Sequence, residues 1–215
     1  GILIVDFKSD SQTQNYIGNA KIVKEKKKFK TNLAIYHPIF ISQNSVKIKC
    51  EVISIENNST TAISGASIGS YVVGPIDRNT NSTGDYVLPI GDAINYRPVF
   101  ITPNSTTQTT YTAEYKNTAH SSISYDINGY NNTPTTSGDN IDHVAMGCWW
   151  DIERSAIGSD CYVALNWDNN SGVDSPSDIV LAHWNGTSWD KIGTTLTGSD
   201  GTGSATATAG RVKSD

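Results

Sequence analysis

Residues 148–190, CWWDIERSAIGSDCYVALNWDNNSGVDSPSDIVLAHWNGTSWD, contain every tryptophan of the chain: Trp149, Trp150, Trp167, Trp184 and Trp189. A buried tryptophan removes roughly 150–250 Å² from water, which corresponds to about 4–6 kcal/mol of apolar burial. The rest of the chain is rich in serine, threonine, asparagine and glycine and poor in large apolar residues. We therefore expect the core to be organised around this stretch.

The pattern within the stretch is that of β-strands. Apolar side chains at 161, 163, 165 and 167 occupy alternate positions, and those at 148, 150 and 152 do the same. This period of two is typical of a half-buried strand. Folding the two runs about Gly158 sets Ile152 opposite Val163 and Trp150 opposite Leu165. The sequence thus predicts a hairpin with one shared buried face, made of Trp150, Ile152, Val163, Leu165 and Trp167.

Strand signals continue on both sides of this hairpin. A strand at 178–184 is expected to turn at Asn185-Gly186 and to return through Trp189. Short apolar runs predict further strands at 33–36, 39–41, 46–55, 71–76, 86–90, 99–102, 109–116 and, more weakly, 203–210. Because no long segment has helical periodicity, the predicted fold class is all-β, an antiparallel β-sandwich or jelly roll. We divide the chain into an N-terminal strand segment with a lysine-rich stretch, 1–61, and a tryptophan-rich sandwich core, 62–215.

Several short motifs follow one another in a fixed order. They are Leu88-Pro89-Ile90-Gly91-Asp92, Tyr96-Arg97-Pro98-Val99, Trp150–Arg154, Leu165–Asp168 with Ser171-Gly172-Val173, and Ala182–Gly186 with Trp189. In this order they resemble a module of large surface and secreted proteins of Bacteroidota exported by type IX secretion. The resemblance spans about residues 62–215 and implies an extracellular all-β module, without catalytic residues to carry over. It also implies an apolar closing strand after Asp215 and a C-terminal sorting domain. Because the sequence stops at Asp215, before either of them, we expect a processed form or a fragment.

Composition also indicates a secreted, cell-surface protein. Charged residues make up only 17% of the chain, and the abundant small polar residues suit an all-β extracellular domain better than a helical cytosolic enzyme. No run approaches the roughly 18–20 apolar residues of a membrane span. The chain opens directly on an apolar strand-like run, as a mature, processed start would.

The cysteines Cys50, Cys148 and Cys161 cannot all pair within one chain. In the predicted hairpin, Cys148 and Cys161 would lie roughly 20 Å apart, against a Cα limit of about 7 Å for a disulfide. We predict that these two are not bonded to each other. Two interpretations are left: three buried thiols that serve as small apolar residues, or one disulfide from Cys50 to Cys148 or Cys161.

Charge is divided unevenly along the chain. Residues 1–50 hold nine lysines and three acidic residues, whereas the remainder holds seven basic and eighteen acidic residues, which gives +6 and −11. Such a division favours head-to-tail contact between copies. The basic run Lys21–Lys30 is interpreted as an edge strand whose lysines oppose unwanted pairing with other strands. It is not interpreted as a nucleic-acid site, because it lacks aromatic residues on which bases could stack.

The N-terminal strand is a candidate for linking copies. Ile2, Leu3, Ile4, Val5 and Phe7 form an almost wholly apolar run, which is too apolar to be left in water. A sandwich that lacks its closing strand can accept an incoming strand. We therefore expect either donation of this strand to the next subunit of a homopolymer or packing of the strand within its own chain.

Patterns that would indicate an enzyme are missing. The four histidines show no metal-ligand spacing, and neither GxSxG nor a phosphate-binding glycine loop occurs. Asp168, Asn170 and Asp174 supply oxygen ligands near a glycine turn and form a candidate calcium site, although the closing bidentate acid is missing; a plain Asx turn is the alternative. No other cofactor is expected. Outward aromatic residues, Trp149 and Tyr162, are candidates for stacking on a surface polysaccharide.

Two functions follow from these observations. The first is an extracellular structural or adhesive protein, a subunit of a surface filament or adhesin that assembles through β-strand contacts. The second is a carbohydrate-binding module. Coplanar exposed aromatic rings would favour the second, and strand pairing between molecules would favour the first.

Overall fold

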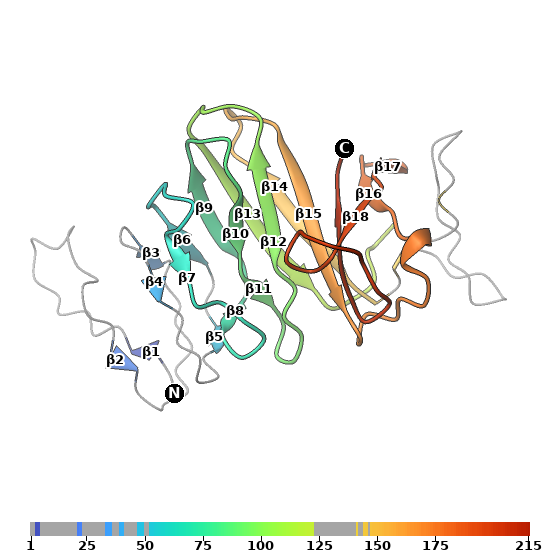
Figure 1. Cartoon of the computed structure of the whole chain (residues 1–215). Helices are drawn as coiled ribbons and strands as arrows, with labels where there is room; N and C mark the ends of the chain where they lie inside the picture. The colour runs from blue at the N-terminus through green and yellow to red at the C-terminus, as the bar shows by residue number, and fades with distance from the viewer. Residues whose placement is uncertain are drawn as a thin grey trace, which may run out of the picture.

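We describe the protein from a computed structural model (Figure 1). The structure describes residues 52–122, 141, 144–145 and 147–215, and before residue 52 only the backbone of short strands. These early strands are β1 Leu3–Ile4, β2 Lys21–Ile22, β3 Leu33–Ile35, β4 Ile39–Phe40 and β5 Lys47–Lys49. Apart from a 3₁₀ turn, η1, at Pro176–Asp178, all regular elements in the described residues are strands. The described residues contain no helix that is both long enough and apolar enough to cross a bilayer. The predicted all-β class is confirmed.

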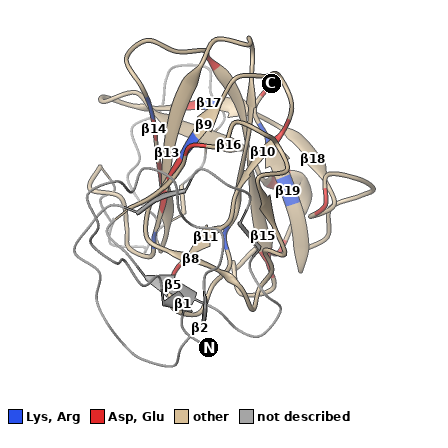
Figure 2. Cartoon of the chain, turned by 90° about the vertical axis from the view of Figure 1, so that its left-hand side faces the viewer, with Lys and Arg blue, Asp and Glu red and all other residues tan. Residues whose placement is uncertain are grey.

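Two five-stranded sheets form the layers of a sandwich (Figure 2). The first, here called the β13 sheet, has the order β14-β13-β9-β6-β3. Its strands besides β3 are β14 Trp149–Arg154, β13 Thr109–Lys116, β9 Ile76–Thr80 and β6 Ile53–Ile55. β13 is antiparallel to both of its neighbours, whereas β6 runs parallel to β9 and β3. Alternate residues of β13 are buried, as the period of a half-buried strand requires.

The second layer, here called the β15 sheet, has the order β10-β12-β15-β19-β18 and is antiparallel throughout. Its strands are β10 Tyr86–Leu88, β12 Val99–Pro103, β15 Cys161–Asp168, β19 Ala209–Lys213 and β18 Thr195–Thr197. Trp167 of β15 faces Gly210 of β19 so closely that any Cβ at position 210 would collide with the indole ring. The Trp167 Nε1 donates a 2.9 Å hydrogen bond to the Thr206 carbonyl oxygen.

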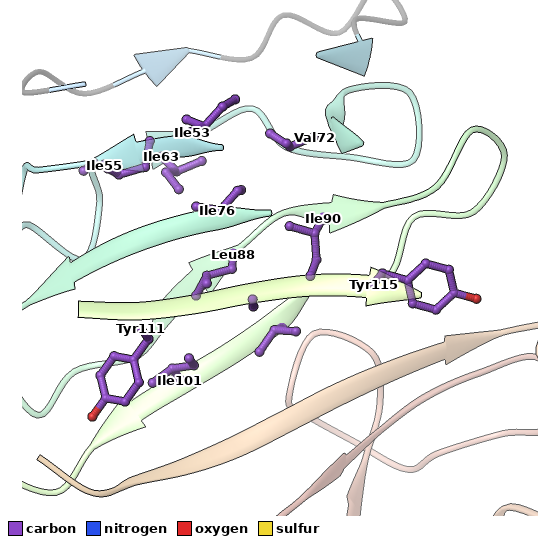
Figure 3. Packing of buried hydrophobic residues seen from close by; sticks show 13 residues of the cluster. Ile53, Ile55, Ile63, Val72, Ile76, Leu88, Ile90, Ile101, Tyr111 and Tyr115 are labelled. Carbon is purple, nitrogen blue, oxygen red and sulfur yellow. The ribbon is translucent and has the colours of Figure 1, made fainter. Parts of the chain in front are cut away.

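The main core lies between these two layers and is built mostly from isoleucine, valine and tyrosine (Figure 3). Fully buried side chains come from both sheets, among them Ile53, Ile76 and Tyr111 on one side and Leu88 and Ile101 on the other. At about 1.5–3 kcal/mol for each buried large apolar side chain, this cluster is the main source of stability.

Shorter pairings surround the sandwich. β8 Tyr71–Val73 lies between β11 Ile90–Gly91 and β5, parallel to both, and β4 pairs in parallel with β7 Ile63–Ser64. β1 and β2 form an antiparallel pair. β16 Leu181–Trp184 and β17 Trp189–Gly193 form the predicted hairpin across Asn185-Gly186.

The β16–β17 hairpin buries both of its faces. Ala182, Trp184 and Trp189 pack with Ile141 and Val144 in one apolar cluster. From the opposite face, Leu181 and Ile192 pack with Trp167 and Val212 of the β15 sheet in another. The hairpin therefore joins two small clusters beside the main core.

The predicted hairpin between residues 148–154 and 161–167 is wrong. β14 pairs with β13, and β15 pairs with β12 and β19, so the two runs belong to different sheets. Their apolar faces still meet, because Trp150, Ile152, Val163 and Leu165 all pack against the main core. Alternation predicts which face of a strand is buried. It does not predict whether two such strands pair within one sheet or pack across the core from opposite sheets.

Other expectations differ in detail. The single strand expected at 46–55 is divided into β5 and β6, which lie in different sheets. Ile53 and Ile55 belong to the main core together with residues beyond 62, so the core extends across the boundary drawn between 61 and 62. The weak strand expected at 203–210 lies further along, as β19, and β18 was not predicted.

Candidate functional site

Among the described residues, the outer edge of β14 is the longest strand edge of the two main sheets without a pairing partner. β14 has 6 residues and, within this part of the chain, pairs with β13 alone. The Ser155 N–H donates to the Thr110 carbonyl across the β13–β14 ladder at 2.9 Å. Since hydrogen-bonding direction alternates along an antiparallel strand, the backbone groups of Trp149, Asp151 and Glu153 face β13, and those of Trp150, Ile152 and Arg154 face outward from the sheet edge.

These three outward residues have no backbone hydrogen bond among the described parts of the chain. Unpaired N–H and C=O groups along a regular strand are a template for another strand. The edge strands of the β15 sheet, β10 and β18, are only 3 residues each. β14 is therefore the edge best suited to accept a strand.

The outer face of β14 is acidic. Trp150 and Ile152 point into the core, so Asp151 and Glu153 point to solvent. Opposite them on β13 lie Glu114 and Thr112. The Glu114 carboxylate accepts a 2.6 Å hydrogen bond from the Lys116 ammonium, whereas no ion pair engages Asp151 or Glu153 among the described residues.

An aromatic cluster lies at the beginning of β14. The His120 ring contacts Trp149, Trp189 and Trp184, with ring centroids at 4.7, 5.2 and 5.7 Å. The Trp184 and Trp189 rings lie 5.6 Å apart. The angles between these ring planes range from 51° to 88°, so the rings pack tilted or edge to face and do not form a flat platform.

Hydrogen bonds fix His120 within this cluster. Its Nδ1 accepts from the Ser122 N–H at 3.2 Å and lies 2.7 Å from the Ser122 Oγ. That hydroxyl in turn accepts a 3.1 Å hydrogen bond from the Trp189 Nε1. The Trp149 Nε1 is buried and finds no hydrogen-bond acceptor among the described residues.

The pairing of Trp149 with Tyr162 as one stacking surface is wrong. Trp149 lies on the outer face of the β13 sheet, and Tyr162 lies on the outer face of the β15 sheet, with the core between them. Tyr162 is 40% exposed, and the Lys213 ammonium lies 5.3 Å from its ring centroid. The two aromatic side chains therefore cannot contact one ligand face.

The candidate calcium loop is organised by an ion pair. Both oxygens of Asp168 accept from the Arg97 guanidinium, at 2.7 and 3.0 Å, and Oδ1 also accepts from the Asn170 N–H at 2.9 Å. Burial would raise the pKa of Asp168, but the Arg97 hydrogen bonds and charge outweigh it and lower the pKa. A cation bound by Asp168, Asn170 and Asp174 would have to displace a buried guanidinium. The hydrogen bond from the Asn170 N–H to Asp168 forms the Asx turn that was the alternative interpretation.

A second buried arginine is held by backbone carbonyl groups, with no carboxylate partner among the described residues. Arg78 is 1% exposed, and its guanidinium donates to the carbonyl oxygens of Asn57, Ser59 and Asn79. It also lies 4.9 Å from the Tyr86 ring centroid, and burial lowers its pKa to about 10. Arg78 thus holds the 57–59 turn against β9. The burial of these two arginines could not be predicted from the sequence, because their partner atoms are distant along the chain or belong to the backbone.

The other site predictions have mixed outcomes. Cys148 and Cys161 are not bonded to each other, as predicted; both are free, and Cys50 lies outside the described residues. In the described ranges, no three histidine, cysteine or acidic side chains come together as a metal site would require. Of the proposed assembly strand, only the backbone at Leu3–Ile4 is described, and it pairs with β2 of its own chain. The side chains of Ile2, Leu3, Ile4, Val5 and Phe7 lie outside the described residues, so donation stays a prediction.

Comparison with known proteins gives no relative. No family model, no curated protein and no solved structure matches the chain.

Proposed function

We propose that the chain is a non-enzymatic extracellular structural or adhesive protein, a subunit of a cell-surface filament that assembles through β-strand contacts. The observation that carries this proposal is the open edge of β14, where backbone groups of successive alternate residues lack partners within the described chain. Natural sheets usually shorten or cover such edges. A regular 6-residue strand edge to which the described residues supply no partner is therefore suited to pairing between molecules.

The location and the binding mode rest on further features. Abundant small polar residues, low charge and the resemblance to type IX-exported surface modules support an extracellular location. The opposite charges of the N-terminal 50 residues and the remainder support contact between copies of the same chain.

Sedimentation velocity and negative-stain microscopy test the proposal directly. At high protein concentration and low ionic strength the full chain should form oligomers or filaments, and these should shorten as salt screens the charged contacts. A protein that remains monomeric across the whole range would refute the proposed function.

A carbohydrate-binding module is the second candidate, and one observation favours it. Trp149 and Trp184 are half-buried in the aromatic cluster, and the Trp149 indole N–H has no acceptor in the described part of the chain. The steep angles between the rings favour a packed cluster over a platform for a sugar. Affinity electrophoresis in gels with embedded polysaccharides distinguishes the two, because Trp184→Ala should abolish a retardation that Tyr162→Ala leaves unchanged.

A further inference from the structure

The edge of β14 is a surface that the same edge of a second copy can join. Its outward backbone groups belong to Trp150, Ile152 and Arg154, which are evenly spaced about Ile152. In an antiparallel pair centred on Ile152, Ile152 lies opposite its counterpart and Trp150 lies opposite Arg154 of the second copy. All three residues then exchange backbone hydrogen bonds with the second copy. No other symmetric register within this 6-residue strand uses all three.

The side chains of this register match on the core side of the sheet. Trp150 and Ile152 pack against the main core, and Arg154 follows them on the same face by alternation. The Arg154 guanidinium of one copy is thus the cross-strand neighbour of the Trp150 ring of the other, and a cation beside an aromatic ring is a favourable pair. The two Ile152 side chains meet at the centre. The register therefore continues the apolar row of β14 from one copy into the next.

The outer face of the same register opposes the pairing. Asp151 of one copy lies opposite Glu153 of the other, and the two-fold symmetry repeats this pair. Like charges directly opposite each other destabilise a strand pair. At neutral pH the two ionised pairs therefore work against the backbone hydrogen bonds and the apolar row.

The neighbouring strands do not neutralise these carboxylates. Glu114 lies opposite Asp151 on β13, and its own charge is paired with Lys116. Asp77 on β9 adds a further negative charge to the outer face, and the titratable ring of His120 belongs to the aromatic cluster at the beginning of β14. Among the described residues no ion pair engages the two acidic side chains of β14, so their repulsion across a β14 pair is uncompensated.

We infer that two copies of this chain pair through their β14 edges in mildly acidic solution, and that repulsion between Asp151 and Glu153 prevents this pairing at neutral pH. Two opposed carboxyl groups are accommodated when they share one proton, so the dimer takes up protons as it forms. Its stability therefore increases as pH falls.

This contact goes beyond the proposed function, although both rest on the open edge of β14. A two-fold contact is closed, because it uses the same edge on both copies and leaves none for a third. At neutral pH the two carboxylates keep the edge free for the strand contact of a filament, and in acid the symmetric contact occupies it. Charged side chains on edge strands commonly prevent such edge-to-edge pairing.

Single charge reversals test the register. Asp151→Lys places a lysine opposite Glu153 of the second copy, twice by symmetry. At pH 7 this variant should form a two-chain species about tenfold to a hundredfold more tightly than the natural chain in sedimentation equilibrium. Glu153→Lys should do the same, because its lysine lies opposite Asp151. The double variant Asp151→Lys with Glu153→Lys places lysine opposite lysine and should associate as weakly as the natural chain.

The matched control is Asp174→Lys, which changes net charge equally at an exposed position away from β14 and should associate like the natural chain. Single reversals that stay monomeric, or a double variant that dimerises as tightly as they do, overturn the inference. In a register centred on residue 151 or 153, one of the two single reversals would oppose lysine to lysine, so a gain in only one of them also overturns it.

The dependence on pH is tested with the natural chain and with the neutral variant Asp151→Asn with Glu153→Gln. Each proton taken up lowers the dissociation constant of the dimer up to tenfold per pH unit. Between pH 7 and pH 5 the dissociation constant of the natural chain should therefore fall at least tenfold, whereas the neutral variant should dimerise equally at both. Association of the natural chain that is the same at both pH values contradicts the inference.

Hydrogen exchange in the Asp151→Lys dimer locates the contact. The amides of Trp150, Ile152 and Arg154 should exchange at least tenfold more slowly in the dimer than in the dilute monomer, and unchanged exchange there refutes the β14 contact. Failure of the proposed function is a separate result. A natural chain that never forms oligomers at neutral pH refutes the filament and leaves the β14 dimer standing, whereas monomeric single reversals refute the dimer and leave the filament standing.

Discussion

The ion pair between Arg97 and Asp168 allows a quantitative test of what holds the Asp168 loop in place. The Arg97 side chain is 4% exposed and that of Asp168 is 26% exposed. Asp168→Asn removes the charge and turns one acceptor into an N–H₂ group that faces the guanidinium. Breaking a buried pair by removing one partner costs about 3–5 kcal/mol. Because Asp168 is partly exposed, we expect the lower end, about 3 kcal/mol.

Urea unfolding followed by tryptophan fluorescence measures this cost. The matched control is Asp160→Asn, since Arg154 and Asp160 form an ion pair with the same 2.7 Å separation but with side chains 41% and 82% exposed. An exposed pair contributes about 0.2–1 kcal/mol. Equal losses in the two variants, or a loss below about 1 kcal/mol for Asp168→Asn, would refute the argument that burial makes the difference.

The same pair predicts a pH dependence. The pKa of Asp168 is lowered in the folded protein, so its contribution is present above the unfolded value of about 3.9 and is lost as pH falls through the folded value. Stability of the natural chain should therefore fall more steeply below about pH 4 than that of Asp168→Asn. Parallel profiles of the two proteins in acid would contradict this.

Further predictions concern single side chains. Trp150→Ala should lower the free energy of unfolding by about 3–4 kcal/mol in urea titrations, since it empties part of the main core and removes the 3.2 Å hydrogen bond from Nε1 to the Arg97 carbonyl; a loss under about 1 kcal/mol would show that this edge of the core is not packed. Gly210→Ala should force the Trp167 indole from its place on β19 and shift its fluorescence to the red, and an unchanged spectrum would argue against that contact. Arg78→Lys should cost about 2–4 kcal/mol by calorimetry, because an ammonium cannot span the carbonyl groups that the guanidinium reaches; stability equal to that of the natural chain would contradict it.

Many of the strands can be predicted from the local alternation of apolar and polar residues, but the way the strands pair and pack cannot. β13 begins and ends at the residues that alternation predicts, and Asn185-Gly186 makes the predicted turn. The partners of β14 and β15 could not be read from alternation, because a run with one apolar face fits equally well beside a neighbouring strand or across the core. Arg97 and Asp168 are 71 residues apart in the chain, and only the tertiary fold brings them together.

The open edge of β14 also has no sequence signature. Its residues alternate as those of an internal strand do, and the edge position results from the order of strands in the sheet. The pairing of Trp149 with Tyr162 failed for the same reason: both alternate outward, but from opposite layers. Outward position on a strand and membership of one surface are separate properties, and only the first is local.

The two buried arginines give the molecule unequal resistance to acid. Arg97 depends on a carboxylate that becomes neutral at low pH, whereas the groups that hold Arg78 are backbone carbonyls, which do not titrate in that range. As protons accumulate, the Asp168 loop and the strands around Arg97 lose their anchor while the 57–59 turn keeps its own. Acid unfolding should therefore begin at the Asp168 end of β15 and reach the β6–β9 side of the sandwich last.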